Sequence, residues 1–198
     1  MENTVKHRCG WCGEDALYQR YHDREWGVPV KDDALLFEFL VLETFQAGLS
    51  WITILKKREG FRAAFDGFDA KAISRYNEGK IDFLMQQKSI VRNRLKIKAT
   101  IANAKAYLKM GELHGSFSHY VWGFVNHRPI TNAYAHYREA PSKTARSTAM
   151  AKTMKKDGFQ FVGSTVAYAF MQAVGMVNDH ETRCFRYGEI AAKTSAKK

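Results

Sequence analysis

Apolar residues recur at helical intervals through most of this chain, and this spacing limits the folds that it can adopt. In the segment DDALLFEFLVLETFQAG, Leu36 and Leu40 lie one helical turn apart within a longer apolar run. Either Asp32 or Asp33 is placed to cap the start of this helix, and Gly48 is placed to end it. Alternation of apolar and polar residues with hairpin turns is absent from the sequence. We therefore predict an all-α fold.

A second strongly periodic segment is RLKIKATIANAKAYLKM, in which Ile97, Ile101 and Leu108 keep the helical spacing. Shorter helices are expected over residues 70–76, 80–87, 117–125, 148–156 and 162–174. The segment over about residues 127–147 holds two of the three prolines and is weakly periodic, so it is predicted to connect a helical body to the last helices. We expect one domain over residues 1–191, followed by a disordered basic tail over 192–198.

The charge of the chain points to a polyanionic partner. The net charge is +11, and residues 83–138 contain nine Lys or Arg against a single acid, Glu112. A nucleic acid would match such a segment, and so would a basic face that is merely solvated. With 45% hydrophobic and 13% aromatic residues, the 198-residue chain can bury a substantial core.

Membrane insertion and disulfide bonding are both disfavoured by the sequence. The longest apolar stretches are interrupted or too short to cross a bilayer, and the start MENTVKHRC carries no apolar signal-peptide core. We therefore expect a cytoplasmic protein with no membrane partner. Three cysteines cannot all pair within one chain, so reduced thiols or metal ligands are expected.

A possible metal site is divided between the two ends of the chain. The segment VNDHETRC places His180 four residues before Cys184, with three residues between them, and the N-terminal segments offer Cys9, Cys12 and His22. Two zinc sets are compatible with this spacing, because either His22 or Cys12 could complete the other three ligands. The Cys9-x2-Cys12 pair is also typical of redox proteins, but no strand precedes it as a thioredoxin-like fold would require. Spacing alone leaves both zinc sets open, and also the absence of a metal.

Several motifs, in the same order along the chain, resemble the bacterial DNA-3-methyladenine glycosylase I family. These motifs are RCGWC, YHDREWGVP, LLFEFLVLETFQAGLSWITILKKRE, IVRNRLKI, VWGFVN and GFQFVGSTVAYAFMQAVGMVNDH, followed by Cys184. The resemblance runs from about residue 8 to residue 184 and implies a helix-hairpin-helix glycosylase fold. It also implies one structural Zn²⁺ per chain, with four ligands that match Cys9, His22, His180 and Cys184 and exclude Cys12.

The family carries out hydrolytic excision of 3-methyladenine, which is flipped out of DNA, and leaves an abasic site without cutting the strand. Aromatic residues are frequent in the N-terminal third, where they suit a hydrophobic core as well as a base pocket. The resemblance assigns Tyr21 and Trp51 to base stacking, and Trp11, Tyr18 and Trp26 to the pocket lining.

An acidic residue on an apolar helix is the expected polar group of this pocket. The helix LLFEFLVLETF carries two acids, Glu38 and Glu43, and a buried carboxylate needs a partner. The resemblance makes Glu43 the catalytic residue that accepts hydrogen bonds from the adenine edge, and Glu38 is expected to be exposed. Residues 83–138 contain no aspartate, in agreement with a family that relies on a labile leaving group.

The segment KSIVRNRLKIK matches the DNA-binding hairpin of the family, so Arg92, Arg94 and Lys96 are expected to meet phosphates. Within QAGLSW, Gly48 supplies a tight turn, and Leu49 is either a wedge for the gap that the flipped nucleotide leaves or a core leucine.

The expected partner is double-stranded DNA with alkylated bases, bound by a monomer in the bacterial cytoplasm that associates with the nucleoid through DNA. The alternative is a zinc-containing helical module that binds damaged DNA without breaking the glycosidic bond.

Overall fold

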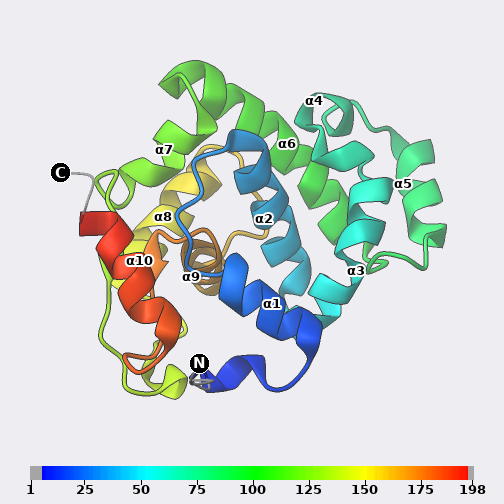
Figure 1. Cartoon of the computed structure of the whole chain (residues 1–198). Helices are drawn as coiled ribbons and strands as arrows, with labels where there is room; N and C mark the ends of the chain where they lie inside the picture. Colours follow the sequence, from blue (N-terminus) through cyan, green and yellow to red (C-terminus); the bar gives the residue numbers. More distant parts are fainter. Residues whose placement is uncertain (1–5, 196–198) are drawn as a thin grey trace.

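Ten helices and one very short sheet make up the part of the chain that the structure describes, residues 6–195 of a computed structural model (Figure 1). The elements in chain order are α1 (Ala16–Arg24), α2 (Asp33–Gln46), α3 (Trp51–Ala64), α4 (Ala70–Ile73), α5 (Glu78–Gln86), α6 (Arg94–His114), α7 (Phe117–Gly123), β1 (Ile130–Thr131), α8 (Ala145–Lys156), α9 (Ser164–Ala173), β2 (Val177–Asn178) and α10 (Phe185–Ser195). Short 3₁₀ turns cover Gly10–Cys12, Asp66–Phe68 and Tyr137–Glu139.

The predicted all-α class is confirmed, with a small addition. Strands β1 and β2 pair in parallel, with Ile130 opposite Val177 and Thr131 opposite Asn178. Two-residue strands carry no period-two pattern that a sequence could display, so the prediction had no signal for them. Among the described residues, the helices are too short or too polar to cross a bilayer.

Helix α2 lies at the centre of the fold and contacts α3, α6, α7 and α9 (Figure 1). Every residue from Leu36 to Phe45 is buried, which explains why the helix is apolar around most of its circumference. Asp32 caps its start by accepting a hydrogen bond from the amide of Leu35 at 2.8 Å, as predicted. The neighbouring Asp33 accepts from the first amides of α7, at Phe117 and Ser118, and so fixes α7 on α2.

Three helices were missing from the sequence prediction: α1, α3 and α10. Helix α1 is short and mostly polar and buries only Tyr21 and His22, so it offered few apolar residues from which to predict a helix. The structure also corrects the C-terminal boundary, because α10 continues to Ser195, into the segment that was expected to be a disordered tail. Residues 196–198 of that tail lie outside the described residues.

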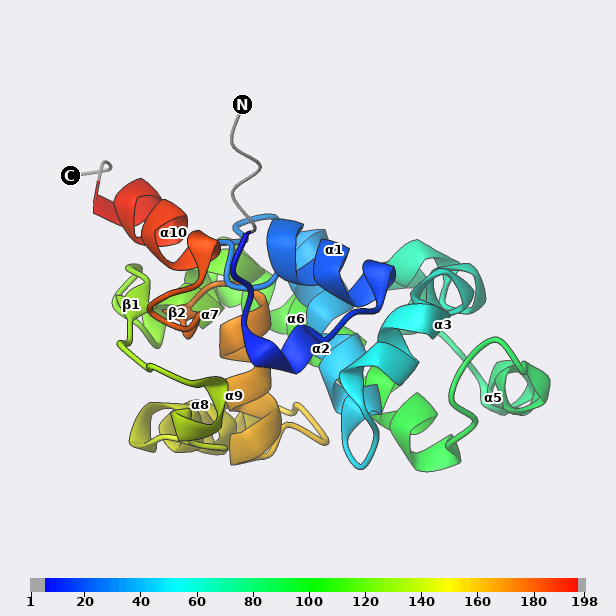
Figure 2. The same ribbon diagram turned by 60° about the horizontal axis from the view of Figure 1, so that its bottom comes forward.

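The turn between α5 and α6 is anchored on α3. Lys57 donates a hydrogen bond from Nζ to the carbonyl oxygen of Lys88 at 2.8 Å. Gly60 of α3 allows a close approach, since a Cβ at that position would lie 2.5 Å from the carbonyl oxygen of Ser89. Asn93 then caps α6 through the amide of Lys96. This α5–α6 hairpin and α10 lie at opposite ends of the molecule (Figures 1 and 2).

Candidate active site and metal centre

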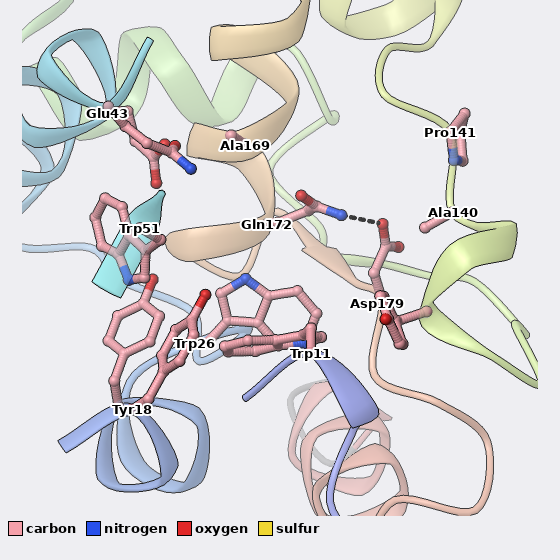
Figure 3. A pocket seen from close by; sticks show the side chains of 13 residues that line it. Trp11, Tyr18, Trp26, Glu43, Trp51, Ala140, Pro141, Ala169, Gln172 and Asp179 are labelled. Carbon is pink, nitrogen blue, oxygen red and sulfur yellow. Dashed lines mark hydrogen bonds between the residues drawn. The ribbon is translucent and has the colours of Figure 1, made fainter. Parts of the chain in front are cut away.

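A pocket of about 270 Å³ lies where α1, α2, α3 and α9 approach the N-terminal turn (Figure 3). This size is near the lower end of the ~300–1,000 Å³ typical of small-molecule sites, so it suits a single planar ring system. Its lining comprises Trp11, Tyr18, Tyr21, Trp26, Glu43, Gln46, Trp51, Tyr137, Ala140, Pro141, Ala169, Gln172 and Asp179. All six side chains that the sequence analysis selected for a base pocket are therefore brought together.

The aromatic walls of the pocket support one another by edge-on packing. Trp11 lies 4.9 Å, centroid to centroid, from both Tyr18 and Trp26, and each pair is T-shaped. Tyr21 and Trp51 form a second pair at 5.3 Å with a tilt of 45°. Tyr21 and Trp51 are only 2% and 7% exposed, so packing against the core fixes the positions of their rings.

Glu43 places a carboxyl group on one wall of this aromatic pocket (Figure 3). The residue is 3% exposed, and desolvation raises the pKa of its carboxyl to about 8. Its Oε2 atom has no hydrogen-bond partner among the described residues, and the same is true of Nε1 of Trp11 and Nε1 of Trp51. Each such buried group costs roughly 1–3 kcal/mol until it is paired. Three unpaired polar atoms in one pocket indicate a site built for a polar ligand.

Glu38 is not the exposed residue that we expected. It is only 8% exposed, and its carboxylate accepts hydrogen bonds from Arg58 and Arg62 of α3. Helix α2 is covered on all sides, so both of its internal acids are buried, and they differ in having or lacking a cationic partner.

Seven further pocket residues were not selected from the sequence. Tyr137, Ala140 and Pro141 come from the connection between β1 and α8, and its weak periodicity gave no indication of which face it covers. Ala169 and Gln172 lie on α9, and Gln46 is the last residue of α2. Asp179 precedes the candidate ligand His180, and this adjacency was the one signal that could have identified it.

A buried cluster that packs against Trp11 and Trp26 of the pocket could hold a metal ion. Its members are the four predicted ligands, Cys9, His22, His180 and Cys184, and one ligand atom from each lies within 4.8 Å of the others. The Sγ atom of Cys9 is 3.4 Å from Nδ1 of His180, and the Sγ atom of Cys184 is 3.5 Å from Nε2 of His22. Hydrogen bonding with Cys9, followed by contacts with His180 and His22, lowers the pKa of the Cys184 thiol.

The second ring nitrogen of each histidine already has a partner, which orients the first nitrogen into the cluster. Nδ1 of His22 is 2.8 Å from the carboxylate of Asp23, and Asp23 is itself held by Arg8. Nε2 of His180 is 3.1 Å from the carbonyl oxygen of Trp26. Such outer partners are typical of metal-binding histidines.

Cys12 does not belong to the metal cluster. Its Sγ donates to the carbonyl oxygen of Cys9 at 3.2 Å, and burial raises the pKa of its thiol to about 11. The ligand set that includes His22 is therefore the one that the fold assembles.

The residues expected to meet DNA are divided between surface and core. Arg92 is exposed, and Arg94 is partly exposed and paired with Asp82. Lys96 corrects the prediction, since it is 6% exposed and its Nζ donates to the carbonyl oxygens of Phe45 and Ala47. Its position in the first turn of α6 turns the side chain inward, against the end of α2.

The turn between α2 and α3 places Leu49, the candidate wedge, at the surface. Gly48 has φ of 84°, a conformation that favours glycine, and Leu49 is 42% exposed. Because Gln46 and Trp51 on either side line the pocket, Leu49 lies beside the pocket.

Known proteins share both this fold and these motifs. A family model described as methyladenine glycosylase matches residues 11–187. A DNA-3-methyladenine glycosylase of Haemophilus influenzae is 50% identical over 177 residues, which cover 89% of this chain and 96% of the relative. A crystal structure of 3-methyladenine DNA glycosylase I has a TM-score of 0.88 at 50% identity and covers 90% of this chain and 98% of its own.

A variant of 3-methyladenine DNA glycosylase I in complex with 3-methyladenine also has a TM-score of 0.88, at 35% identity, with 91% of this chain and 97% of the other covered. The match to the family model covers most of the chain, and the relatives are similar over nearly their whole length. The chain therefore belongs to the methyladenine glycosylase family.

Proposed function

We propose that this protein is a DNA repair glycosylase that flips 3-methyladenine out of duplex DNA and hydrolyses its glycosidic bond, leaving an abasic site. The observation that carries this proposal is the unpaired, buried carboxyl of Glu43 in an aromatic pocket. Similarity to DNA-3-methyladenine glycosylases supports the same substrate.

The chemistry of the lesion explains why these side chains are sufficient. A purine methylated at N3 carries a positive charge while it is attached to the sugar, and it becomes neutral when it leaves. Much of the activation is thus in the substrate, and the protein must extrude the nucleotide and bind its base. The faces of Tyr21 and Trp51 favour an electron-poor ring by roughly 0.5–2 kcal/mol beyond simple burial.

Glu43 adds a hydrogen-bonding group to this aromatic binding site. With a pKa near 8 its carboxyl is mostly protonated in the empty pocket at neutral pH, and an incoming cation favours the ionised form. Its oxygen would accept a hydrogen bond from the exocyclic amino group of adenine, which otherwise would lose its hydration in the pocket. We expect no strand cleavage.

We infer that the metal of the buried cluster is Zn²⁺. In a tetrahedral zinc site, Zn–S and Zn–N bonds of about 2.3 Å and 2.0 Å separate a sulfur ligand from a nitrogen ligand by about 3.5 Å. Three of the four sulfur–nitrogen pairs in the cluster are separated by 3.4, 3.5 and 3.6 Å. Four protein ligands leave no position for a substrate, so zinc would supply structural support rather than chemistry.

The remaining DNA contacts fit a helix-hairpin-helix arrangement, which we assign to α5, its turn and α6. Arg92 and Arg94 would contact phosphates from this hairpin, and Leu49 would fill the gap in the duplex. We further infer that the chain acts as a monomeric, single-domain enzyme on nucleoid DNA in the bacterial cytoplasm.

Base release from methylated duplex DNA tests this function. The protein should release 3-methyladenine and leave alkali-sensitive abasic sites, and a Glu43→Gln variant should release the base at least tenfold more slowly while it still binds DNA. Binding of the damaged DNA without base release would favour a damage-binding module instead. Undiminished release by Glu43→Gln would refute the role of this carboxyl.

A further inference from the structure

We propose that Gln172 is a specificity-determining residue, whose fixed side-chain carbonyl selects adenine-type over guanine-type lesions. This inference rests on the proposed function and adds a second recognition group to Glu43. Gln172 lies on α9 and lines the pocket, and Figure 3 shows its side chain between Glu43 and Asp179.

The amide of Gln172 is held in one orientation by Asp179. Its Nε2 donates to Oδ2 of Asp179 at 2.9 Å, and Tyr168 donates its hydroxyl to the same oxygen at 2.6 Å. The other oxygen, Oδ1, accepts from Nδ2 of Asn132 at 2.6 Å. If the amide of Gln172 were reversed, its oxygen would face a carboxylate oxygen of Asp179, and two acceptors cannot form a hydrogen bond. The amide therefore keeps Nε2 toward Asp179.

The backbone around Gln172 is fixed as well. Its carbonyl oxygen accepts a hydrogen bond from the amide of Gly27 at 3.1 Å, which ties α9 to the segment that follows α1. Nearby Gly175 packs so closely that a Cβ there would lie 2.4 Å from the carbonyl carbon of Val28. Gln172 is therefore fixed both by its backbone and by the Nε2 atom of its side chain.

The consequence is a fixed acceptor that faces the ligand. With Nε2 engaged, Oε1 of Gln172 points away from Asp179 toward the side of the pocket that holds Glu43 (Figure 3). Among the described residues, no hydrogen bond is made to this oxygen, and Oε2 of Glu43 is likewise unpaired. The pocket thus offers two acceptors on neighbouring walls.

Two acceptors match the amino group of adenine, which carries two N–H donors. Guanine has a carbonyl oxygen at the same ring position, so an acceptor would meet an acceptor. Glu43 can adjust to either base, because its carboxyl, with a pKa near 8, can take up a proton and become a donor. Gln172 has no such freedom while Asp179 holds its Nε2, and so it is the residue that discriminates.

The test compares two lesions in the same DNA. Duplex DNA treated with a methylating agent contains both 3-methyladenine and 3-methylguanine, and single-turnover release of the two bases is measured together. Their ratio is independent of the fraction of active enzyme. We expect Gln172→Met, which keeps the length of the side chain but removes the acceptor, to lower the adenine-to-guanine ratio at least tenfold.

Gln160→Met is the matched control, because it makes the same substitution at an exposed glutamine outside the lining of this pocket. Its ratio should stay within twofold of the starting protein. A second measurement is the affinity of the whole chain for free 3-methyladenine, monitored by the quenching of tryptophan fluorescence in the pocket. It should weaken at least tenfold in Gln172→Met, with the melting temperature of each variant recorded as a check on folding.

An unchanged ratio in Gln172→Met, or an equal fall in both variants, would overturn the role of Gln172 while leaving the glycosylase activity intact. If release by Gln172→Met is too slow for a ratio, undiminished binding of the free base would overturn the role, and weakened binding would support it. Failure of the unaltered protein to release 3-methyladenine at all would instead overturn the proposed function and this inference with it.

Discussion

Glu43 is buried without a cationic partner, and this single residue links stability to binding. Burial in the pocket raises the pKa of its carboxyl to about 8 from an ordinary value of 4.5. The folded protein therefore holds a proton on this group between about pH 4.5 and pH 8, where the unfolded chain has released it. The same unpaired carboxyl is what the proposed cationic base would meet.

A titration of stability should reveal this proton. Because the folded state binds more protons, the contribution of Glu43 to the free energy of unfolding falls as pH rises through this window, by roughly 1.4 kcal/mol per pH unit at most. Urea unfolding of Glu43→Gln and the unaltered protein at pH 5, 6, 7 and 8 should show the variant gaining relative stability with pH, by a few kcal/mol in total.

The control for this titration is Glu59→Gln, since the side chain of Glu59 is 82% exposed on α3. Its stability relative to the unaltered protein should change little across the same pH range. A stability difference for Glu43→Gln that stayed constant from pH 5 to pH 8 would contradict the raised pKa.

Individual site residues were predictable where their chemistry is unusual for their surroundings. An acid on an apolar helix and a cluster of aromatic residues both stood out, and the fold brings them to one pocket. Burial was harder to predict, as Glu38 and Lys96 show, because a helix covered on all sides gives no polar stripe from which to assign an exposed face. Gln172 was missed because an amide on a helix gives no signal until its partner, Asp179, is placed beside it.

At the level of elements, Lys96 joins the hairpin that is proposed to bind DNA to the helix that carries Glu43. Its ammonium group lies at the C-terminal end of α2 and donates to two carbonyl oxygens there. A cation at this end also complements the helix dipole. The residue therefore stabilises the turn that presents Leu49 and Trp51.

Removing this ammonium group should be costly. Lys96→Met leaves the buried carbonyl group of Phe45 without this donor, whereas the exposed Ala47 can turn to water, so we expect a loss of about 1–3 kcal/mol in the free energy of unfolding, measured in urea. Lys98→Met is the matched control, because Lys98 lies two residues further along α6, with its side chain 46% exposed and paired with Glu78. Equal losses of unfolding free energy in the two variants would show that the contacts of Lys96 with α2 stabilise the fold no more than an exposed ion pair does.

Helices with long apolar patterns were predictable, whereas α1, α3 and α10, whose patterns are shorter or interrupted by charged residues, were not. The predicted segments within α2 and α6 have long apolar patterns, and their positions agree with the structure. Helices α1 and α10 were missed, although α1 supplies Tyr18, Tyr21 and His22 to the pocket and the metal cluster. Their stability comes from tertiary contacts of these few residues, and helical spacing does not encode such contacts.

For the whole molecule, the metal cluster joins two segments that are far apart in sequence. Cys9 and His22 come from the N-terminal segment, and His180 and Cys184 from the segment before α10. The same N-terminal segment carries Trp11, Tyr18 and Tyr21 of the pocket. The metal is thus expected to hold one wall of the binding pocket in place and also to join the N-terminal segment to the segment before α10.

Metal removal should consequently lower stability and base binding together. By analogy with a covalent link across a loop of this length, losing the metal should cost about 4 kcal/mol or more. We expect the unaltered protein to contain one Zn²⁺ per chain by atomic absorption, and His180→Ala to lose it together with much of its melting temperature. Cys12→Ser should retain the metal, because the Cys12 thiol hydrogen-bonds to backbone oxygens and lies outside the cluster of four ligands. At a temperature where His180→Ala is still folded, its affinity for free 3-methyladenine should fall, since Trp11 and Tyr18 lose their anchor. A metal-free variant with unchanged stability would show that the four side chains hold the chain ends together without an ion.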